Sequence, residues 1–491
     1  MDLSLALASA HTQLITGRDA QVADLAGLDA SNDLYFHRQG LLQAHAAGLN
    51  GSWTLREGFQ PAEFDFGSSE SVRRHLASPA PYDDWLRQVL GRLIAEERPD
   101  FIGLSVAVPY QLFGAFRIAS LLRDLAPDVP VVLGGNIPSR LAGQMALPWV
   151  FDLVDILSTH QGEETLAALL TAGPDRAAWS AVPNIRYREG EGVRATPTRY
   201  LDRRLFAQPS YDGIDFDAYW GFPYATIMAS RGCYYGKCPF CAIPYTWGEK
   251  GFLGHDHPAA VVETMVDCID RRGVNRFKFI EESLHPRIVD QLATHLIEAG
   301  VEAMWEGYAR MDAPWFRSSF LNKAARAGLR KLYVGLELVD SDGRDLLAKK
   351  DRPAASEFLR AQADAGILVH LFILVGHPGT GLDEAMRTID FVLAHEDLID
   401  TIEISGFRYE KHTTIADVLR CPDPVRDWSL DDPYTSTLTP TLSPGAVDLL
   451  EDQLYWGVGS KTPRWTHPLH HMVSPWAMPS KTRAGQPALA T

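Results

Sequence analysis

The stretch Arg231-Gly-Cys-Tyr-Tyr-Gly-Lys-Cys-Pro-Phe-Cys241 gathers three of the chain's five cysteines within nine residues. A short loop that contains glycine and proline brings Cys233, Cys238 and Cys241 toward one point, as iron–sulfur clusters and structural zinc both require. The loop supplies three ligands, so a fourth coordination position is either open or filled from elsewhere in the chain. An open position is where a metal centre can carry out chemistry.

Six apolar, strand-like segments separated by helical patterns begin just before this cysteine loop. The expected strands are 225–230, 275–281, 301–308, 331–337, 367–375 and 400–406. The expected helices are 259–272, 286–299, 314–327, 341–347 and 381–394. This alternation predicts a partial, open TIM-like (β/α)6 barrel. The cysteines follow the first strand, which puts them at the carboxyl ends of the strands, where the active sites of such barrels lie.

A second α/β pattern precedes the barrel. Strand-like segments at 100–108, 129–135 and 154–157 alternate with an amphipathic helix over 112–125 and a helix that starts near Gly162. The pattern predicts a doubly wound, Rossmann-like parallel sheet, which binds ligands beyond the carboxyl ends of its strands. Gly134 and Gly135 end one of these strands, where the lack of side chains lets a ligand approach the backbone closely.

The length of 491 residues indicates two to four domains. We expect an N-terminal extension at 1–90, the Rossmann-like domain at 91–190, the barrel at 191–415 and a small, mainly helical C-terminal segment at 416–491. In the extension, 34–36 and 40–46 favour one or two helices and no strand. In the C-terminal segment, which is rich in Pro, Trp and Tyr, one helix is expected at 446–455.

Composition excludes several classes of partner. The 46 basic and 62 acidic residues give a formal charge of −16, which argues against a nucleic-acid backbone as the main partner. No segment reaches the roughly 18–20 apolar residues that span a bilayer, and the start lacks the basic flank of a signal peptide. Five cysteines in so long a chain do not form a disulfide framework, so we expect a reducing cytoplasm.

The cysteine spacing alone leaves two other interpretations open. C-x4-C-x2-C is also the spacing of a plant-type 2Fe–2S ferredoxin, for which Cys268 would be the fourth ligand. However, Cys268 lies in an amphipathic helical pattern, where a free cysteine commonly behaves as a small buried hydrophobe. A structural zinc site completed by His255 or His257 is the other interpretation.

The cysteine loop and the barrel pattern together resemble the radical S-adenosylmethionine (SAM) superfamily. Its members carry three cysteines after the first strand of a partial β/α barrel, usually spaced C-x3-C-x2-C, and this chain has one residue more. The resemblance implies a 4Fe–4S cluster on Cys233, Cys238 and Cys241, with SAM chelating the iron that has no cysteine. Phe240 matches the aromatic position beside the adenine of SAM.

Motifs at later strand ends extend this resemblance. It implies further SAM contacts from Glu281, Glu282, Arg310, Glu337 and Gly376. Paired carboxylates suit a cationic amine, and an arginine suits a carboxylate. Two departures stand beside these matches: Leu338 replaces the usual serine after Gly-Leu-Glu, and His377 interrupts a Gly-Phe-Pro-Gly-Glu-Thr motif.

The Rossmann-like region resembles the cobalamin-binding domain of cobalamin-dependent radical SAM enzymes. The resemblance implies that Ser105, Gly134 and Gly135 line that cofactor. The Asp-x-His-x-x-Gly signature for histidine ligation of cobalt is absent, as it is in many radical SAM members. Within this group the chain looks closest to enzymes that mature ribosomally made peptides.

The resemblance implies chemistry carried by cofactors. A 5′-deoxyadenosyl radical would abstract hydrogen from an unactivated carbon of a natural-product or peptide substrate, and cobalamin would deliver a methyl group to that carbon. The alternative is a radical SAM rearrangement or ring-forming enzyme in which cobalamin donates no methyl group. An electron-transfer or zinc-stabilised binding protein is the alternative from a different class. An electron donor such as flavodoxin or ferredoxin is the implied protein partner, and no catalytic side chain is assigned.

Overall fold

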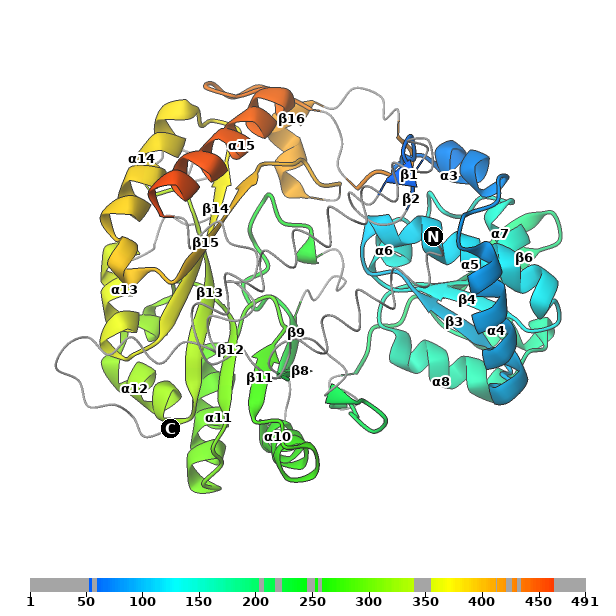
Figure 1. The fold of residues 1–491 in the computed structure, drawn as a ribbon, viewed down its shortest axis with the longest axis horizontal. Helices are drawn as coiled ribbons and strands as arrows, with labels where there is room; N and C mark the ends of the chain where they lie inside the picture. The colour runs from blue at the N-terminus through cyan, green and yellow to red at the C-terminus, as the bar shows by residue number, and fades with distance from the viewer. Residues whose placement is uncertain are drawn as a thin grey trace.

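The computed structural model describes residues 53–54, 60–202, 207–216, 223–244, 252–254, 258–339, 355–411, 413–420, 426–430 and 434–462. Two lobes lie side by side (Figure 1). The first holds a mixed sheet with helices on both faces, and the second holds a curved parallel sheet with helices outside it. The helices expected at 34–36, 40–46 and 341–347 lie outside the described residues. Both α/β architectures expected from the sequence are confirmed.

The sheet of the first lobe has the strand order β3-β4-β5-β6-β7. Its three parallel strands are β3 (Ile102–Ser105), β4 (Val131–Gly134) and β5 (Ile156–Ser158). The strands β6 (Ile185–Glu189) and β7 (Gly192–Ala195) form a hairpin, in which β6 pairs antiparallel to β5. The described parallel part is therefore shorter than a full Rossmann sheet, and the hairpin extends it.

Strand alternation explains why this sheet has helices on both faces. Val131 and Leu133 point into the core that α5 (Leu112–Leu125) covers. Val132 points into a second, smaller core with Leu169 of α8 (Gly162–Ala172). The remaining helices of the lobe are α3 (Ser69–Leu76), α4 (Asp83–Glu97), α6 (Asn136–Arg140) and α7 (Val150–Leu153). The short strands β1 (Trp53–Thr54) and β2 (Gln60–Pro61) pair within the region where no strand was expected.

The second lobe has six parallel strands in the order β8-β11-β12-β13-β14-β15, as a (β/α)6 partial barrel requires. The strands are β8 (Ala225–Ile227), β11 (Arg276–Phe279), β12 (Met304–Ala309), β13 (Leu329–Glu337), β14 (Leu368–Val375) and β15 (Thr401–Gly406). The helices are α10 (Pro258–Arg272), α11 (Pro286–Glu298), α12 (Ser318–Arg326), α13 (Ala355–Asp364) and α14 (Leu382–Ala394). All six expected strands are confirmed.

The barrel strands alternate between an apolar outer side and a polar inner side. Phe277 and Phe279 of β11 are fully buried in the large hydrophobic core, whereas Lys278 between them lies 3.3 Å from the Glu306 carboxylate of β12. Deeper in the barrel the ammonium group of Lys331 contacts the Asp400 carboxylate at 2.8 Å. Each of these buried or half-buried charges has an opposite partner, which is what makes their burial tolerable.

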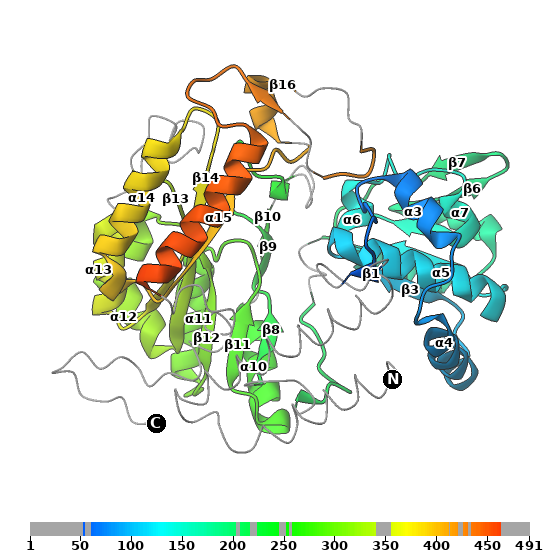
Figure 2. The same cartoon turned by 45° about the horizontal axis from the view of Figure 1, so that its top comes forward.

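The C-terminal segment packs against both lobes. The expected helix is α15 (Pro444–Lys461), which lies along α14 and the last two barrel strands (Figure 2). The backbone at 426–430 reaches the first lobe, where the Trp428 ring stacks against Phe116 and Trp149 at centroid distances of 5.6 and 5.4 Å. Among the residues that the structure describes, no helix is long and apolar enough to cross a bilayer.

Candidate functional site

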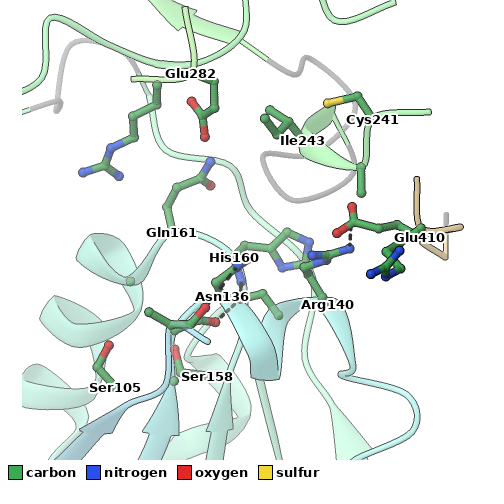
Figure 3. A pocket seen from close by; sticks show the side chains of 18 of the residues that line it. Ser105, Asn136, Arg140, Ser158, His160, Gln161, Cys241, Ile243, Glu282 and Glu410 are labelled. Atoms are coloured by element: carbon green, nitrogen blue, oxygen red, sulfur yellow. Dashed lines mark hydrogen bonds and ion pairs between the residues drawn. The ribbon is translucent and has the colours of Figure 1, made fainter. Parts of the chain in front are cut away.

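A cavity of about 1210 Å³ lies where the carboxyl ends of the two sheets face each other (Figure 3). The first lobe contributes the ends of its three parallel strands, and the second contributes the cysteine loop and several barrel strand ends. Seven of the site residues predicted from the sequence line this cavity: Ser105, Gly134, Gly135, Phe240, Cys241, Glu282 and Glu337. The cavity therefore brings together residues expected at cobalamin with residues expected at SAM and the cluster.

The cysteine loop is anchored to the barrel at its first cysteine. β9 (Ser230–Gly232) leads into Cys233, which forms a parallel bridge with Ser283. The additional residue of the C-x4-C interval is accommodated by Gly236, whose φ of +58° lies in the left-handed region that glycine adopts freely. The N–H of Cys241 then donates to the carbonyl of Cys238 at 3.1 Å, which closes a turn.

The three thiols lie near enough to affect one another. Burial, followed by the neighbouring Cys238 and Cys233, raises the pKa of Cys241 to about 12. Among the described residues, no three Cys, His, Asp or Glu side chains are grouped closely enough to hold a single metal ion. Three cysteine thiols on one loop are a donor set that an iron–sulfur cluster uses.

Of the two alternative metal sites, the described residues bear on the one that uses Cys268. Cys268 is fully buried in the barrel-lobe core on α10, and burial raises the pKa of its thiol to about 11. It packs as a small hydrophobe, as its helical pattern predicted. His255 and His257 lie outside the described residues.

Arg310, expected at the SAM carboxylate, points toward the cysteine loop. Its Nη1 donates to the sulfur of Cys238 at 3.6 Å, and its guanidinium carbon lies 3.5 Å from the centroid of the Tyr235 ring. Its Nε lies 3.5 Å from an Asp312 carboxylate oxygen. Arg310, although described, is not among the residues that line the cavity. The side chain therefore supports the loop that carries the cysteines.

The adjacent residues Glu281 and Glu282 face opposite ways. Glu282 lines the cavity, whereas Glu281 is 1% exposed and accepts the backbone N–H of Ala229 at 3.0 Å. Burial raises the pKa of Glu281 to about 8. One of the two expected carboxylates thus faces the cavity, and the other ties the end of β11 to the segment after β8.

The fourth and fifth barrel strands end in left-handed residues with different roles. Glu337 has a φ of +59° and lines the cavity, and a non-glycine residue held there is typical of a functional site. Gly376 has a φ of +73°, but a Cβ there would lie 2.4 Å from Val447 Cγ2 of α15. The close approach of α15 therefore requires glycine at this position. His377, which interrupts the expected motif, is buried between the rings of Phe240 and Phe407.

Several polar cavity residues were missed from the sequence. From the first lobe these include Asn136, Arg140, Ser158, His160 and Gln161, and from the second they include Arg408 and Glu410. Arg140 and Glu410 pair across the lobes at 3.2 Å (Figure 3). Those of the first lobe stand at or within a few residues of a strand end, which is a signal that the sequence contains. The cross-lobe pairing has no local signal.

Comparison with solved structures agrees with this architecture. The radical SAM methyltransferase TsrM from Kitasatospora setae, solved with tryptophan substrate and a SAM analog, is 20% identical with a TM-score of 0.56. The match covers 70% of this chain and 71% of TsrM. The cobalamin-dependent SAM radical enzyme OxsB, solved with aqua-cobalamin and SAM, is 15% identical with a TM-score of 0.60, over 77% of this chain and 61% of OxsB.

The fold is that of cobalamin-dependent radical SAM enzymes. No protein-family model and no curated protein matches the sequence. The chain spans about three fifths of the length of OxsB. At these identities the likeness establishes the cobalamin-dependent radical SAM fold, and the activity has to be argued from the site.

Proposed function

We propose that the chain is a radical SAM enzyme that uses a 4Fe–4S cluster, SAM and cobalamin to methylate an unactivated carbon of a natural-product or peptide substrate. The observation that carries the proposal is the shared cavity. One space is lined by residues expected at cobalamin, such as Ser105 and Gly134. The same space is lined by residues expected at SAM and the cluster, such as Phe240 and Cys241. Two cofactors held from opposite sides could act there on one substrate.

On the barrel side, Cys233, Cys238 and Cys241 would hold the cluster. Phe240, Glu282 and Glu337 line the cavity beside them and would contact SAM. We assign supporting roles to the other three expected contacts. Arg310 holds the cysteine loop, Glu281 joins two strands, and Gly376 gives α15 room to pack.

On the sheet side, Ser105, Gly134 and Gly135 would hold cobalamin. Gly135 has a φ of +106°, and a Cβ there would lie 2.6 Å from the carbonyl oxygen of Val106, so the turn needs glycine. When bound, the cluster supplies an electron to SAM, and cobalamin supplies the methyl group. The apolar lining residues Leu104, Ile243 and Phe372 would keep water from the reacting carbon.

Anaerobic reconstitution of the full chain with iron, sulfide and cobalamin tests the proposal. We expect about four irons per chain and retained cobalamin. With SAM, a reductant or flavodoxin, and candidate substrates, we expect 5′-deoxyadenosine, S-adenosylhomocysteine and a methylated product. The variant C238A should lose the cluster and both SAM-derived products.

Two other results would reject parts of the proposal. 5′-Deoxyadenosine without S-adenosylhomocysteine or methyl transfer would reject methylation and favour a rearrangement or ring-forming enzyme. Bound zinc without an iron–sulfur cluster would reject radical chemistry altogether.

A further inference from the structure

His160 occupies an unusual backbone position on the sheet side of the cavity. It follows β5 and lines the cavity (Figure 3). Its φ of +59° lies in the left-handed region, which a histidine adopts only when its surroundings impose that conformation. Among the described residues lining the cavity, Glu337 is the other non-glycine residue with such a φ.

Hydrogen bonds tie the His160 backbone to the glycine turn expected at cobalamin. The N–H of His160 donates to Ser139 Oγ at 2.9 Å. The hydroxyl of Ser139 in turn donates to the carbonyl of Gly135 at 2.7 Å. The histidine is therefore positioned relative to Gly134 and Gly135, although it lies on a different strand end.

The ring of His160 is oriented by the preceding residue. Its Nδ1 lies 3.0 Å from Thr159 Oγ1, and that hydroxyl also lies 3.1 Å from the carbonyl oxygen of Asn184. The hydroxyl has one proton, and a carbonyl can only accept. Both contacts are hydrogen bonds when Thr159 donates to Asn184 and His160 Nδ1–H donates to Thr159. In that tautomer Nε2 carries the lone pair.

The surroundings favour the neutral form of this ring. Burial, with a smaller contribution from Arg186, lowers the pKa of His160. The edge of the ring meets the Tyr200 ring at a centroid distance of 5.5 Å. Within the described part of the chain, Nε2 makes no hydrogen bond. A neutral imidazole whose Nδ1–H is held by a neighbour is the form that proteins use to ligate metals.

We propose that His160 ligates, through Nε2, the cobalt of a cobalamin bound in this cavity; the inference rests on the proposed function. Among the described residues of the first lobe that line the cavity, His160 is the only histidine, and none of them is a cysteine. Imidazole nitrogen is a suitable donor for a first-row metal ion. The absent Asp-x-His-x-x-Gly signature would then be replaced by a histidine after β5.

Electron paramagnetic resonance of the full chain loaded with cob(II)alamin tests the ligation without any turnover. The wild type is prepared in two forms, one with natural histidine and one with histidine labelled with ¹⁵N. We expect a three-line nitrogen splitting of the cobalt signal in the first form and a two-line splitting in the labelled form, because ¹⁴N and ¹⁵N differ in nuclear spin. H160A should bind cobalamin without this label-dependent splitting.

Two further variants separate ligation from loss of structure. T159V removes the group that orients the ring, so we expect a weakened splitting with cobalamin still bound. T171V makes the same substitution at an exposed position on α8, outside the cavity lining, and should keep the splitting of the wild type.

The negative results are distinguishable. A spectrum that ¹⁵N-histidine leaves unchanged, with cobalamin bound, would overturn the inference and spare the proposed function, since the cofactor's own base could supply the nitrogen. A wild-type chain that retains no cobalamin would overturn the cobalamin part of the proposed function, and the ligation with it.

Discussion

Arg310 donates from Nη1 to the sulfur of Cys238 at 3.6 Å while its guanidinium lies on the ring of Tyr235. The contact joins the end of β12 to the cysteine loop. Tyr234, the preceding residue of that loop, donates to the carboxylate of Asp312, so both tyrosines in the longer C-x4-C interval have partners after β12. The arrangement gives the additional length of the interval a structural role.

We predict that R310Q lowers the reduction potential of the reconstituted cluster. A donor to a cysteine ligand draws charge from the sulfur and favours the reduced cluster. Loss of one hydrogen bond, about 1 kcal/mol, corresponds to about 40 mV for a one-electron couple. A redox titration followed by electron paramagnetic resonance measures the shift. R287Q removes the same charge from an exposed position on α11 and should leave the potential unchanged. Equal potentials in R310Q and the wild type would contradict the prediction.

We predict that Glu281 makes the folded protein less stable as pH rises from about 4.5 to about 8. Burial raises the pKa of Glu281 to about 8, so the folded state keeps a proton that the unfolded state has already released. This contribution is fully present below the unfolded pKa and is lost as pH rises through the folded pKa. Urea unfolding between pH 5 and 8, compared for the wild type and E281Q, measures it.

The amide of E281Q can still accept the N–H of Ala229 and does not titrate. Its free energy of unfolding should therefore fall less steeply with pH than that of the wild type. E298Q, at an exposed position on α11, should follow the wild type. Parallel curves for E281Q and the wild type would argue against a protonated Glu281.

The positions of the strands followed from the sequence because barrel strands carry a strong local signal. Continuing the alternation of Phe277 and Phe279 with Lys278 also predicts which side of the sheet each of the next two glutamates faces. Glu281 shares the parity of the buried phenylalanines, and Glu282 shares that of the inward Lys278. The resemblance assigned both glutamates to SAM. The strand alternation, continued past the end of β11, distinguishes them.

Contacts between distant segments carried no such signal. Arg140 and Glu410 are paired across the cavity, yet each stands in a stretch that alone predicts a loop or a helix end. The direction of Arg310 depends in the same way on Tyr235, which lies on another element. Such side-chain directions are set by tertiary packing, so the sequence located these residues or their neighbours and did not orient them.

We predict that W428A lowers the free energy of unfolding by about 3–5 kcal/mol, as is typical of a buried tryptophan. Trp428 is buried in the core of the first lobe, where its ring stacks on Phe116 and Trp149. Its Nε1–H donates to the carbonyl of Gln144 at 3.0 Å. Urea unfolding monitored by circular dichroism measures the loss.

W428F provides the matched control, because it keeps an aromatic ring and removes the hydrogen bond. We expect a smaller loss, of which the missing hydrogen bond accounts for about 1 kcal/mol. Equal losses in W428A and W428F would mean that the stacked ring contributes nothing beyond its N–H.

We predict that G376A destabilises the barrel lobe through α15 and does not act through SAM. The positive φ of Gly376 costs an alanine roughly 1–2 kcal/mol, and the clash with Val447 adds about 1–3 kcal/mol. G366A separates the two effects, because Gly366 has a φ of +74° with nothing within 4 Å of its Cβ position. G366A should therefore show the backbone cost alone. Urea unfolding of both variants measures the difference.

The double variant G376A/V447A tests whether Val447 is the source of the clash. Shortening Val447 leaves room for the new methyl group, so the two substitutions should together cost less than the sum of their separate effects. Calorimetric titration of each reconstituted single variant with SAM then separates packing from ligand contact. Unchanged SAM affinity in folded G376A fits the packing role. A selective loss of SAM affinity, with stability equal to that of G366A, would contradict the packing role and support a contact between Gly376 and SAM.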